Sequence, residues 1–304
     1  MIGRYFNWAV LTALLSFSTL VFGQTALEDG YAKLRRGDYS GAIAAFEAVA
    51  ESGKIADRKG LAQALIATGQ LEKAGVQAQK LSKQKAGKSA SQVLLARIDF
   101  IRGKYRAVIK RLKKEVRVNP ANLEARILIS EAKLASGAHS DSLQEADEIA
   151  DLWNEGQVKG AEGLTLLGRA LHLTRYYKDA NEIFGEALEH NPNYVPAHLY
   201  WARLFLEKYD EQQAGQSLDR VLKVNPNHPY ALALTAKIDM SSDNDVVKAL
   251  ARIKKALAVN PRCVPALRIH AHILIQTEQL TAALKLLDQA LAVNPNDSIS
   301  QTFQ

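Results

Sequence analysis

Histidine, cysteine and paired carboxylates are the residues of this sequence that could carry out catalysis or hold a metal ion. The seven histidines form no His-Glu-x-x-His helix, in which two imidazoles and a general base meet at zinc. Cys263 is the only cysteine, so the chain has neither a thiolate cluster nor an internal disulfide. The carboxylates are scattered, and no glycine-rich phosphate loop is present. The sequence therefore predicts a non-catalytic protein without a metal or cofactor.

Two residue types leave an alternative open. His270 and His272 lie two positions apart on a predicted helix, so their imidazoles point in different directions and do not easily share a metal. We expect His272 to be solvated, with a binding contact as the alternative. Cys263 is expected to be a small residue at a turn, with an intermolecular disulfide or a reactive thiol as the alternative.

A repeat supplies the elements that must position any binding residues. Asn-Pro occurs at 119–120, 191–192, 225–226, 260–261 and 294–295, and the last four are 34, 35 and 34 residues apart. Proline lacks the amide needed to continue a helix and pushes the preceding residue out of the helical region. Each Asn-Pro is therefore predicted to end a helix.

Each period contains two predicted helices. In the last period, apolar residues recur with helical spacing over Ala266–Ile275 and again over Ala283–Leu291. Polar turns separate the two helices, and four of these turns contain a glycine that provides a left-handed helix stop: Gly37, Gly69, Gly103 and Gly137. A composition of 47% hydrophobic residues with few prolines agrees with a helical protein that has a sizeable core.

The pattern resembles the tetratricopeptide repeat family. It is most complete in residues 161–194, which carry Leu164, Leu167, Gly168, Leu171, Tyr177, Ala180, Phe184, Ala187 and Pro192. The resemblance covers about residues 25–297 and implies an all-α fold, a right-handed α-solenoid of about eight helical hairpins. Seven or nine repeats stay open, because repeats one and two lack the terminal proline and repeat four has serines at small apolar positions.

Two columns of the second helices are predicted to form the core. A small-residue column runs through Ala42, Ala74, Val108, Ser142, Ala180, Ala214, Ala249 and Ala283. Four residues later a larger column runs through Phe46, Ala78, Leu112, Ala146, Phe184, Leu218, Ile253 and Leu287. A small side chain lets neighbouring helices approach, and the larger one fills the groove beside it.

The ends of the chain differ from the repeats. Residues 1–23 combine one positive charge with an apolar stretch, which predicts a signal peptide or, alternatively, an N-terminal anchor. Residues 24–297 are predicted to be the solenoid, and 298–304 a short tail. This tail is too short for a solid capping helix, so Leu284, Leu287 and Leu291 are expected to be exposed or covered by something else.

The resemblance also implies a binding groove, because the first helices of such hairpins line the concave face. One inward column reads Tyr31, Gln63, Arg97, Glu131, Arg169, Arg203, Ile238 and His272. Arginine suits forked recognition of carboxylates. We expect the groove of repeats three to eight to bind a peptide of acidic character, with Phe100 adding apolar contact. The candidate groove residues are Arg97, Arg169, Tyr200, Arg203, Arg268 and His272.

The net charge of +7 is unevenly distributed. Between Lys73 and Arg117 there are fourteen Lys or Arg and two acidic residues, a net charge of +12. The candidate basic patch consists of Lys80, Lys83, Lys85, Lys88, Lys110, Arg111, Lys113 and Lys114. Such a patch fits an acidic protein, an anionic glycan or a membrane surface, and no nucleic acid is expected; a solvated convex face is the favoured alternative.

The sequence therefore predicts an exported, periplasmic or secreted scaffold that binds proteins or peptides without catalysis. A second hypothesis rests on a looser resemblance. The segments Leu204–Tyr209 and Val224–Pro229 are similar to amino-terminal solenoids of large secreted bacterial metallopeptidases. On that hypothesis the chain is the non-catalytic part of a larger hydrolase and contains none of its metal ligands.

Overall fold

The computed structural model describes residues 26–50, 53–241 and 245–303, except for the side chains of 139–142. The signal segment predicted at 1–23 lies outside these residues. Within them the chain is helical, with one short 3-10 turn (Lys85–Gly87) and no strand. The predicted all-α solenoid is confirmed, and the described residues form eight hairpins.

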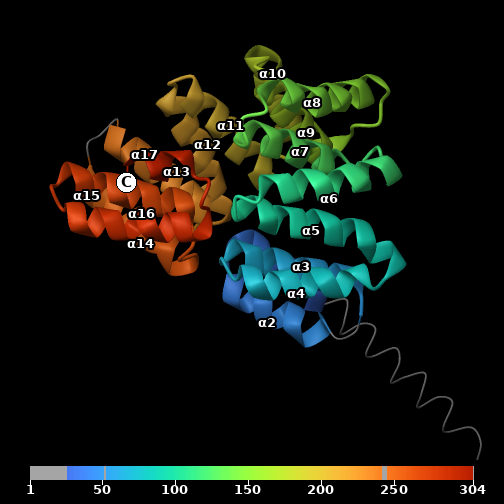
Figure 1. Ribbon diagram of the computed structural model, residues 1–304, viewed down its shortest axis with the longest axis horizontal. Coiled ribbons are helices and arrows are strands. Elements are labelled where there is room, and N and C mark those ends of the chain that lie inside the picture. The colour runs from blue at the N-terminus through green and yellow to red at the C-terminus, as the bar shows by residue number, and fades with distance from the viewer. Residues whose placement is uncertain (1–25, 51–52, 242–244, 304) are drawn as a thin grey trace, which may run out of the picture.

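The hairpins follow one another with short connections (Figure 1). In order, they are 26–36 with α2 (Tyr39–Ala50), α3 (Ile55–Ala67) with α4 (Leu71–Ser82), α5 (Lys88–Ile101) with α6 (Tyr105–Val118), α7 (Leu123–Ala135) with α8 (His139–Asn154), α9 (Gly160–Leu173) with α10 (Tyr177–His190), α11 (Val195–Glu207) with α12 (Glu211–Val224), α13 (Pro229–Ser241) with α14 (Val246–Val259), and α15 (Val264–Gln276) with α16 (Leu280–Val293). A last helix, α17 (Ser298–Phe303), packs on α16.

In the seven hairpins whose turn lies wholly within the described residues, the turn contains a residue with a left-handed backbone. The four predicted glycine turns have it, with φ between 69° and 83°. Repeats five, six and eight use Arg175, Tyr209 and Glu278 instead, at φ between 60° and 66°. A side chain in this region costs roughly 1–2 kcal/mol, so these three turns are held by the packing of the helices on either side.

Asparagine ends the second helix wherever Asn-Pro was predicted to do so. Asn119, Asn191, Asn225, Asn260 and Asn294 are the C-cap residues of α6, α10, α12, α14 and α16. In the last four of them, the side-chain Oδ1 accepts a hydrogen bond from the backbone N–H two residues later. The asparagine side chain therefore shapes the turn that leads to the next repeat.

Both predicted core columns are buried. Each described member of the small-residue column and each member of the larger column is at most 1% exposed. The closest packing is at Phe46, whose ring fills the space where Gly30 and Gly60 lack a side chain; a Cβ on Gly30 would lie 2.7 Å from the ring. Phe184 packs on Gly168 in the same way, also at 2.7 Å.

The superhelix returns on itself, so that repeats six to eight lie beside repeats one to three (Figure 1). We call this junction the seam. It joins the glycine turn inside one repeat to the asparagine turn at the end of another repeat, five places further along the chain. The three turn pairs are Gly37 with Asn225, Gly69 with Asn260, and Gly103 with Asn294.

The first and third turn pairs of the seam use the same hydrogen bonds. Asn225 Nδ2 donates to the Tyr39 hydroxyl at 3.1 Å, and Asn227 Nδ2 donates to the Gly37 carbonyl at 3.0 Å. Asn294 bonds to Tyr105 at 3.1 Å and Asn296 to Gly103 at 2.9 Å in the equivalent positions.

In the middle turn pair, Leu71 replaces the tyrosine, and an ion pair takes its place. Arg262 Nη1 lies 2.9 Å and 2.8 Å from the two carboxylate oxygens of Glu72. Neutral hydrogen bonds contribute about 1 kcal/mol each and exposed ion pairs about 0–1 kcal/mol. The seam is therefore weaker than the apolar packing between consecutive repeats.

The predicted end of the solenoid needs correction. Residues 298–303 form α17, with Ser300 fully buried, and Leu287 is fully buried inside its own hairpin, so only Leu284 is clearly exposed, at 42%. Gln301 Nε2 donates to the Pro295 carbonyl at 2.8 Å. Arg126 and His198 make the same bond to the prolines six residues before them, so α17 stands where the first helix of a repeat stands.

His228 directly precedes α13 and caps its first turn. Its Nδ1 accepts a hydrogen bond from the Ala231 N–H at 3.2 Å, which requires an unprotonated Nδ1. Burial lowers the pKa of His228 from 6.5 to about 4. The neutral ring therefore persists in the folded protein at pH values where the unfolded chain is already protonated.

Gly103→Ala is expected to destabilise the protein more than Gly137→Ala. Both glycines have a positive φ, so each substitution costs about 1 kcal/mol in backbone strain. Only the Cβ on Gly103 would overlap the Asn294 side chain, whereas nothing lies within 4 Å of a Cβ on Gly137. Urea unfolding should show about 1–2 kcal/mol more loss for Gly103→Ala, from the weakened seam bonds. Equal losses would contradict the role of the seam.

Stability is expected to fall as the pH drops from 6.5 to about 4, in part because of His228. A folded-state pKa below the unfolded value means that the unfolded chain binds the extra proton first, so the contribution is complete above pH 6.5 and lost below it. The shift corresponds to at most about 3 kcal/mol. His228→Asn keeps a capping side chain but cannot titrate. Urea unfolding at pH 7 and pH 4.5 should show a smaller pH dependence for this variant; an unchanged dependence would refute the assignment.

Candidate functional site

A cavity of about 600 Å³ lies on the concave side of the superhelix. Its walls come from the first helices of repeats two to six, α3, α5, α7, α9 and α11, together with His228 at the start of α13. The charged lining consists of Arg97, Glu124, Glu131, Glu162, Arg169 and Arg203. A second hollow of about 420 Å³ continues it and shares Glu131, Arg169, Tyr200 and Arg203. We call the two together the central cavity.

Two of the predicted groove arginines already have carboxylate partners. Arg169 is 7% exposed and lies 2.8 Å from Glu131 Oε1. Arg97 forms an ion pair with Glu124. Because Glu131 lies in the same inward column as the arginines, one repeat supplies the acid that the next repeat's arginine requires. These guanidinium groups stabilise the cavity wall and are already occupied by carboxylates.

Arg203 differs from them. Its side chain is exposed to both hollows of the central cavity, and no carboxylate among the described residues forms an ion pair with it. The Tyr200 ring positions it: the guanidinium carbon of Arg203 lies 5.4 Å from the ring centroid, and that of Arg169 lies 4.1 Å from it. The aromatic ring thus separates a paired guanidinium from one that can accept an anionic group.

Glu162 is the acidic counterpart of Arg203 in the larger hollow. It lies in the first turn of α9, is exposed in the cavity, and has no ion-pair partner among the described residues. Seven residues separate it from Arg169 along α9, about 10 Å of helix. The Tyr194 phenol lies nearby, and its pKa is raised to about 12 by burial and by Glu162, so it stays protonated and can donate a hydrogen bond.

The charges of the larger hollow are balanced. Three arginines face three glutamates in its lining. A strongly acidic ligand would meet as many carboxylates as guanidinium groups, so the lining does not support the acidic character expected of the partner. It favours a ligand that carries both kinds of charge, placed to meet Arg203 and Glu162.

Three hydrogen-bonded side chains, His172, Tyr177 and Glu207, form part of the lining of the smaller hollow. Glu207 accepts hydrogen bonds from His172 Nε2 at 2.6 Å and from the Tyr177 hydroxyl at 2.8 Å. Burial acts to raise the pKa of Glu207, but these two bonds together with the charges of His172 and Lys208 lower it overall, while burial lowers the pKa of His172. The group links α9, α10 and α11.

The other two predicted groove residues lie outside the central cavity. Arg268 forms an ion pair with Asp297 at 3.0 Å, just before α17. His272 is exposed, and its ring lies 6.0 Å from that of Phe303. Both interactions attach the last helix to repeat eight. Tyr200 and Phe100 do line the cavity, next to Arg203 and Arg97 respectively.

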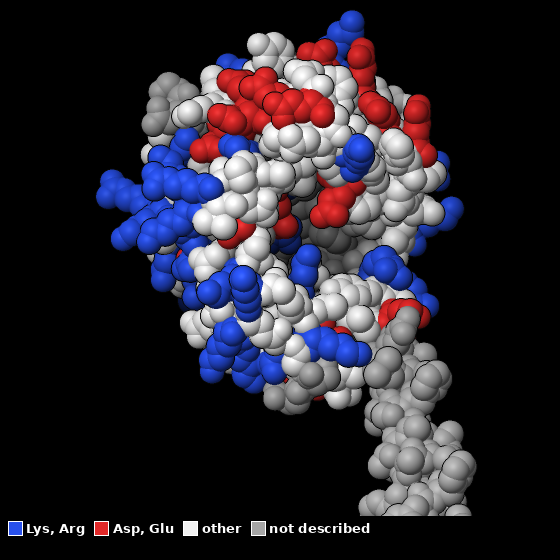
Figure 2. Space-filling model, turned by 90° about the vertical axis from the view of Figure 1, so that its right-hand side faces the viewer, with Lys and Arg blue, Asp and Glu red and all other residues white. Residues whose placement is uncertain are grey.

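The basic patch lies on an outer face of repeats two and three. Lys88, Lys110, Arg111 and Lys114 surround an open depression of about 640 Å³. Lys83, Lys85 and Lys113 are exposed, Lys80 is partly buried, and Arg111 is engaged by Asp99 at 3.0 Å. Figure 2 shows basic side chains gathered on the left and lower parts of one face and acidic ones across its top.

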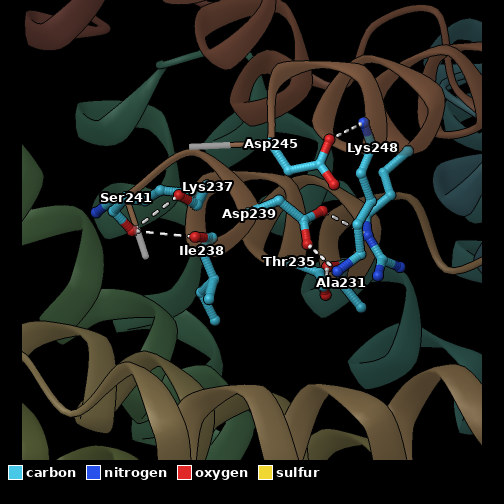
Figure 3. Close-up of polar contacts among 9 residues, drawn as sticks. Ala231, Thr235, Lys237, Ile238, Asp239, Ser241, Asp245 and Lys248 are labelled. Carbon is cyan, nitrogen blue, oxygen red and sulfur yellow. Dashed lines mark hydrogen bonds and ion pairs between the residues drawn. The ribbon is translucent and has the colours of Figure 1, made fainter. Parts of the chain in front are cut away.

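A separate polar cluster in repeat seven is structural. Asp239 is 3% exposed, and its carboxylate lies 2.6 Å from Arg252 Nε and 3.0 Å from Lys248 Nζ (Figure 3). Asp245 caps α14 through the Lys248 N–H at 2.9 Å. The cluster joins α13 to α14. Asp99 and Arg111 form the equivalent pair in repeat three.

Metal binding and thiol chemistry find little support among the described residues. They contain no group of three or more His, Cys, Asp or Glu side chains able to hold a metal ion. Cys263 is 6% exposed, and burial raises the pKa of its thiol to about 11, which favours the unreactive thiol over the thiolate. No helix among the described residues is long and apolar enough to cross a membrane.

The residues of the seam were not predicted from the sequence. A partial signal was present: Asn-Pro-Asn occurs at 225–227 and 294–296, although also at 191–193 outside the seam, and Gly-x-Tyr occurs at 37–39 and 103–105. The glutamates that neutralise Arg97 and Arg169 were not predicted either, although Glu131 stands in the predicted inward column.

Known proteins can now be compared with this geometry. Interferon-induced protein with tetratricopeptide repeats 2 of Cricetulus griseus is 31% identical over 119 residues, which cover 38% of this chain and 25% of that protein. The chain thus matches about a quarter of the length of this relative.

Two solved structures share the fold. A thermophilic tetratricopeptide repeat protein of Thermus thermophilus has a TM-score of 0.50 at 20% identity, covering 62% of this chain and 99% of its own. The Cut9–Hcn1 hetero-tetramer of the APC/C has a TM-score of 0.53 at 13% identity, covering 88% of this chain and 52% of its own. Sequence profiles described as "Tetratricopeptide repeat" match residues 27–90, 176–238 and 242–304, more than half of the chain. With eight such hairpins in its fold, the chain belongs to the tetratricopeptide repeat family.

Proposed function

We propose that this protein holds a segment of a partner polypeptide in its central cavity and performs no catalysis. Tetratricopeptide repeats make it a protein-interaction scaffold, and the proposal concerns where and how it binds. We also propose that it acts outside the cytoplasm, on the strength of the apolar N-terminal segment. The observation that carries the proposal is Arg203, the cavity arginine without a carboxylate partner among the described residues.

An extended peptide fits the placement of the open charges. Glu162 and the Arg169–Tyr200–Arg203 stack are about two helical turns apart, roughly 10 Å. An extended chain covers about 3.3 Å per residue, so side chains about three residues apart can reach both. The ligand we infer carries an acidic side chain for Arg203 and a basic one for Glu162.

Aromatic side chains support the same ligand. Tyr200 presents its ring beside Arg203, and the Tyr194 phenol provides a hydrogen-bond donor for a peptide carbonyl. Tyrosine gives a large contact area at a low cost in side-chain entropy. Arg169 is unsuitable for a binding test, since its charge reversal would leave Glu131 without a partner inside the wall.

Arg203→Glu is expected to weaken peptide binding by about 10- to 100-fold, because a charge-assisted hydrogen bond contributes roughly 1.5–3 kcal/mol. The probes are peptides selected on the wild-type protein from a random display library, and calorimetry measures their affinity. Arg220→Glu is the matched control, since Arg220 is also exposed on a helix of repeat six but lies outside the central cavity.

Charge reversal in the probe sharpens this test. Replacing the acidic residue of a selected peptide by lysine should restore its binding to Arg203→Glu and weaken its binding to the wild type. If wild type and Arg203→Glu bind every selected peptide equally well, the proposed function is wrong.

A further inference from the structure

The seam separates the central cavity from the outside along one side. Ile66, Phe100 and Ile101 reach the cavity from repeats two and three, and Leu199, Arg203 and His228 reach it from repeats six and seven. These are repeats that the seam brings side by side or their direct neighbours. While the seam is closed, the first helices and the seam together surround the cavity. A polypeptide can then enter only with one of its own termini first.

From this arrangement we propose that the seam is a gate, which opens to admit an internal segment of a partner polypeptide and then closes around it. The inference rests on the proposed function, since it names the route to the same cavity. The partner is a chain whose binding segment lies between folded parts, which are too bulky to be threaded through a closed superhelix.

The chemistry of the seam suits a gate. Its polar contacts are hydrogen bonds of asparagine side chains and one ion pair, made between turns and the first residues of α2, α4 and α6. None of the clusters of buried apolar residues in the described chain includes residues from both sides of the seam. Opening it exposes polar groups that water can satisfy, whereas separating two consecutive repeats exposes apolar core.

The repeated geometry explains how the gate closes in register. Asn227 bonds to the Gly37 carbonyl and Asn296 to the Gly103 carbonyl, in two equivalent pairs. Between them, Arg262 and Arg102 both contact Glu72, the second at 3.0 Å. Because the middle pair is ionic and exposed, salt weakens it.

A disulfide across the seam tests the inference. A Cβ on Gly103 would lie 3.4 Å from the Asn296 Cβ, close to the 3.5–4.5 Å usual for disulfides. The locked variant is Gly103→Cys with Asn296→Cys in a Cys263→Ser background, and it also carries Asn294→Ala to remove the side chain that the new Cβ would overlap. The control is the same protein after reduction, which carries the same substitutions without the lock.

The probe is a display-selected peptide whose binding depends on Arg203, used in two forms. One form has free ends, and the other places the same sequence between two stable globular domains. The oxidised protein is expected to bind the free-ended form and to lose binding of the flanked form. Reduction should restore binding of the flanked form.

Equal binding of the flanked form before and after reduction would overturn the gate and leave the proposed function standing. If oxidation weakens the free-ended form as well, the lock has altered the cavity. In that case the second pair, Gly37→Cys with Asn227→Cys, whose Cβ positions are 3.2 Å apart, repeats the comparison and decides it, with Asn225→Ala removing the side chain that the Cβ at position 37 would overlap. Failure of the proposed function is read separately, from unlocked protein in which Arg203→Glu has no effect.

Discussion

The contact between large rings and glycines sets how closely the helices of this protein approach one another. The Phe46 ring occupies the space left by Gly30 on the first helix of its own hairpin and by Gly60 on the next repeat. One side chain thus joins three helices. The stacking of neighbours at such contacts fixes the small rotation from each repeat to the next, and the accumulated rotation gives a solenoid its curvature.

That curvature gives rise to two kinds of contact between repeats, which differ in their chemistry. Along the stack, consecutive repeats share buried apolar side chains, which are expensive to separate. Where the superhelix meets itself, the contacts are between polar turns. The cavity lies inside both, so its wall combines a rigid arc with a weaker closure. The paired Arg169 belongs to the rigid arc, and the open Arg203 projects from it.

Periodicity made the repeats predictable. A column such as Ala42, Ala74 and Val108 needs only local spacing, and the residue before proline ends a helix wherever it stands. The open state of Arg203 was not predictable, because the pairing of Arg169 with Glu131 depends on which rotamers face each other across two repeats. Arg268 was misplaced for a similar reason, since its partner Asp297 lies directly before the segment that was expected to be a tail. The seam joins residues about 190 positions apart, a distance at which one sequence without relatives gives no register.

The seam also bears on how such a chain can change length over evolution. An open solenoid can gain or lose one repeat anywhere, because each unit touches only its neighbours. Here the turn of one repeat meets the turn that follows the fifth repeat after it, so duplicating a unit between repeats three and six would move every asparagine turn out of phase with its glycine partner. Such a protein is free to grow at its ends but not in its middle. The seam therefore fixes the number of repeats between its paired turns.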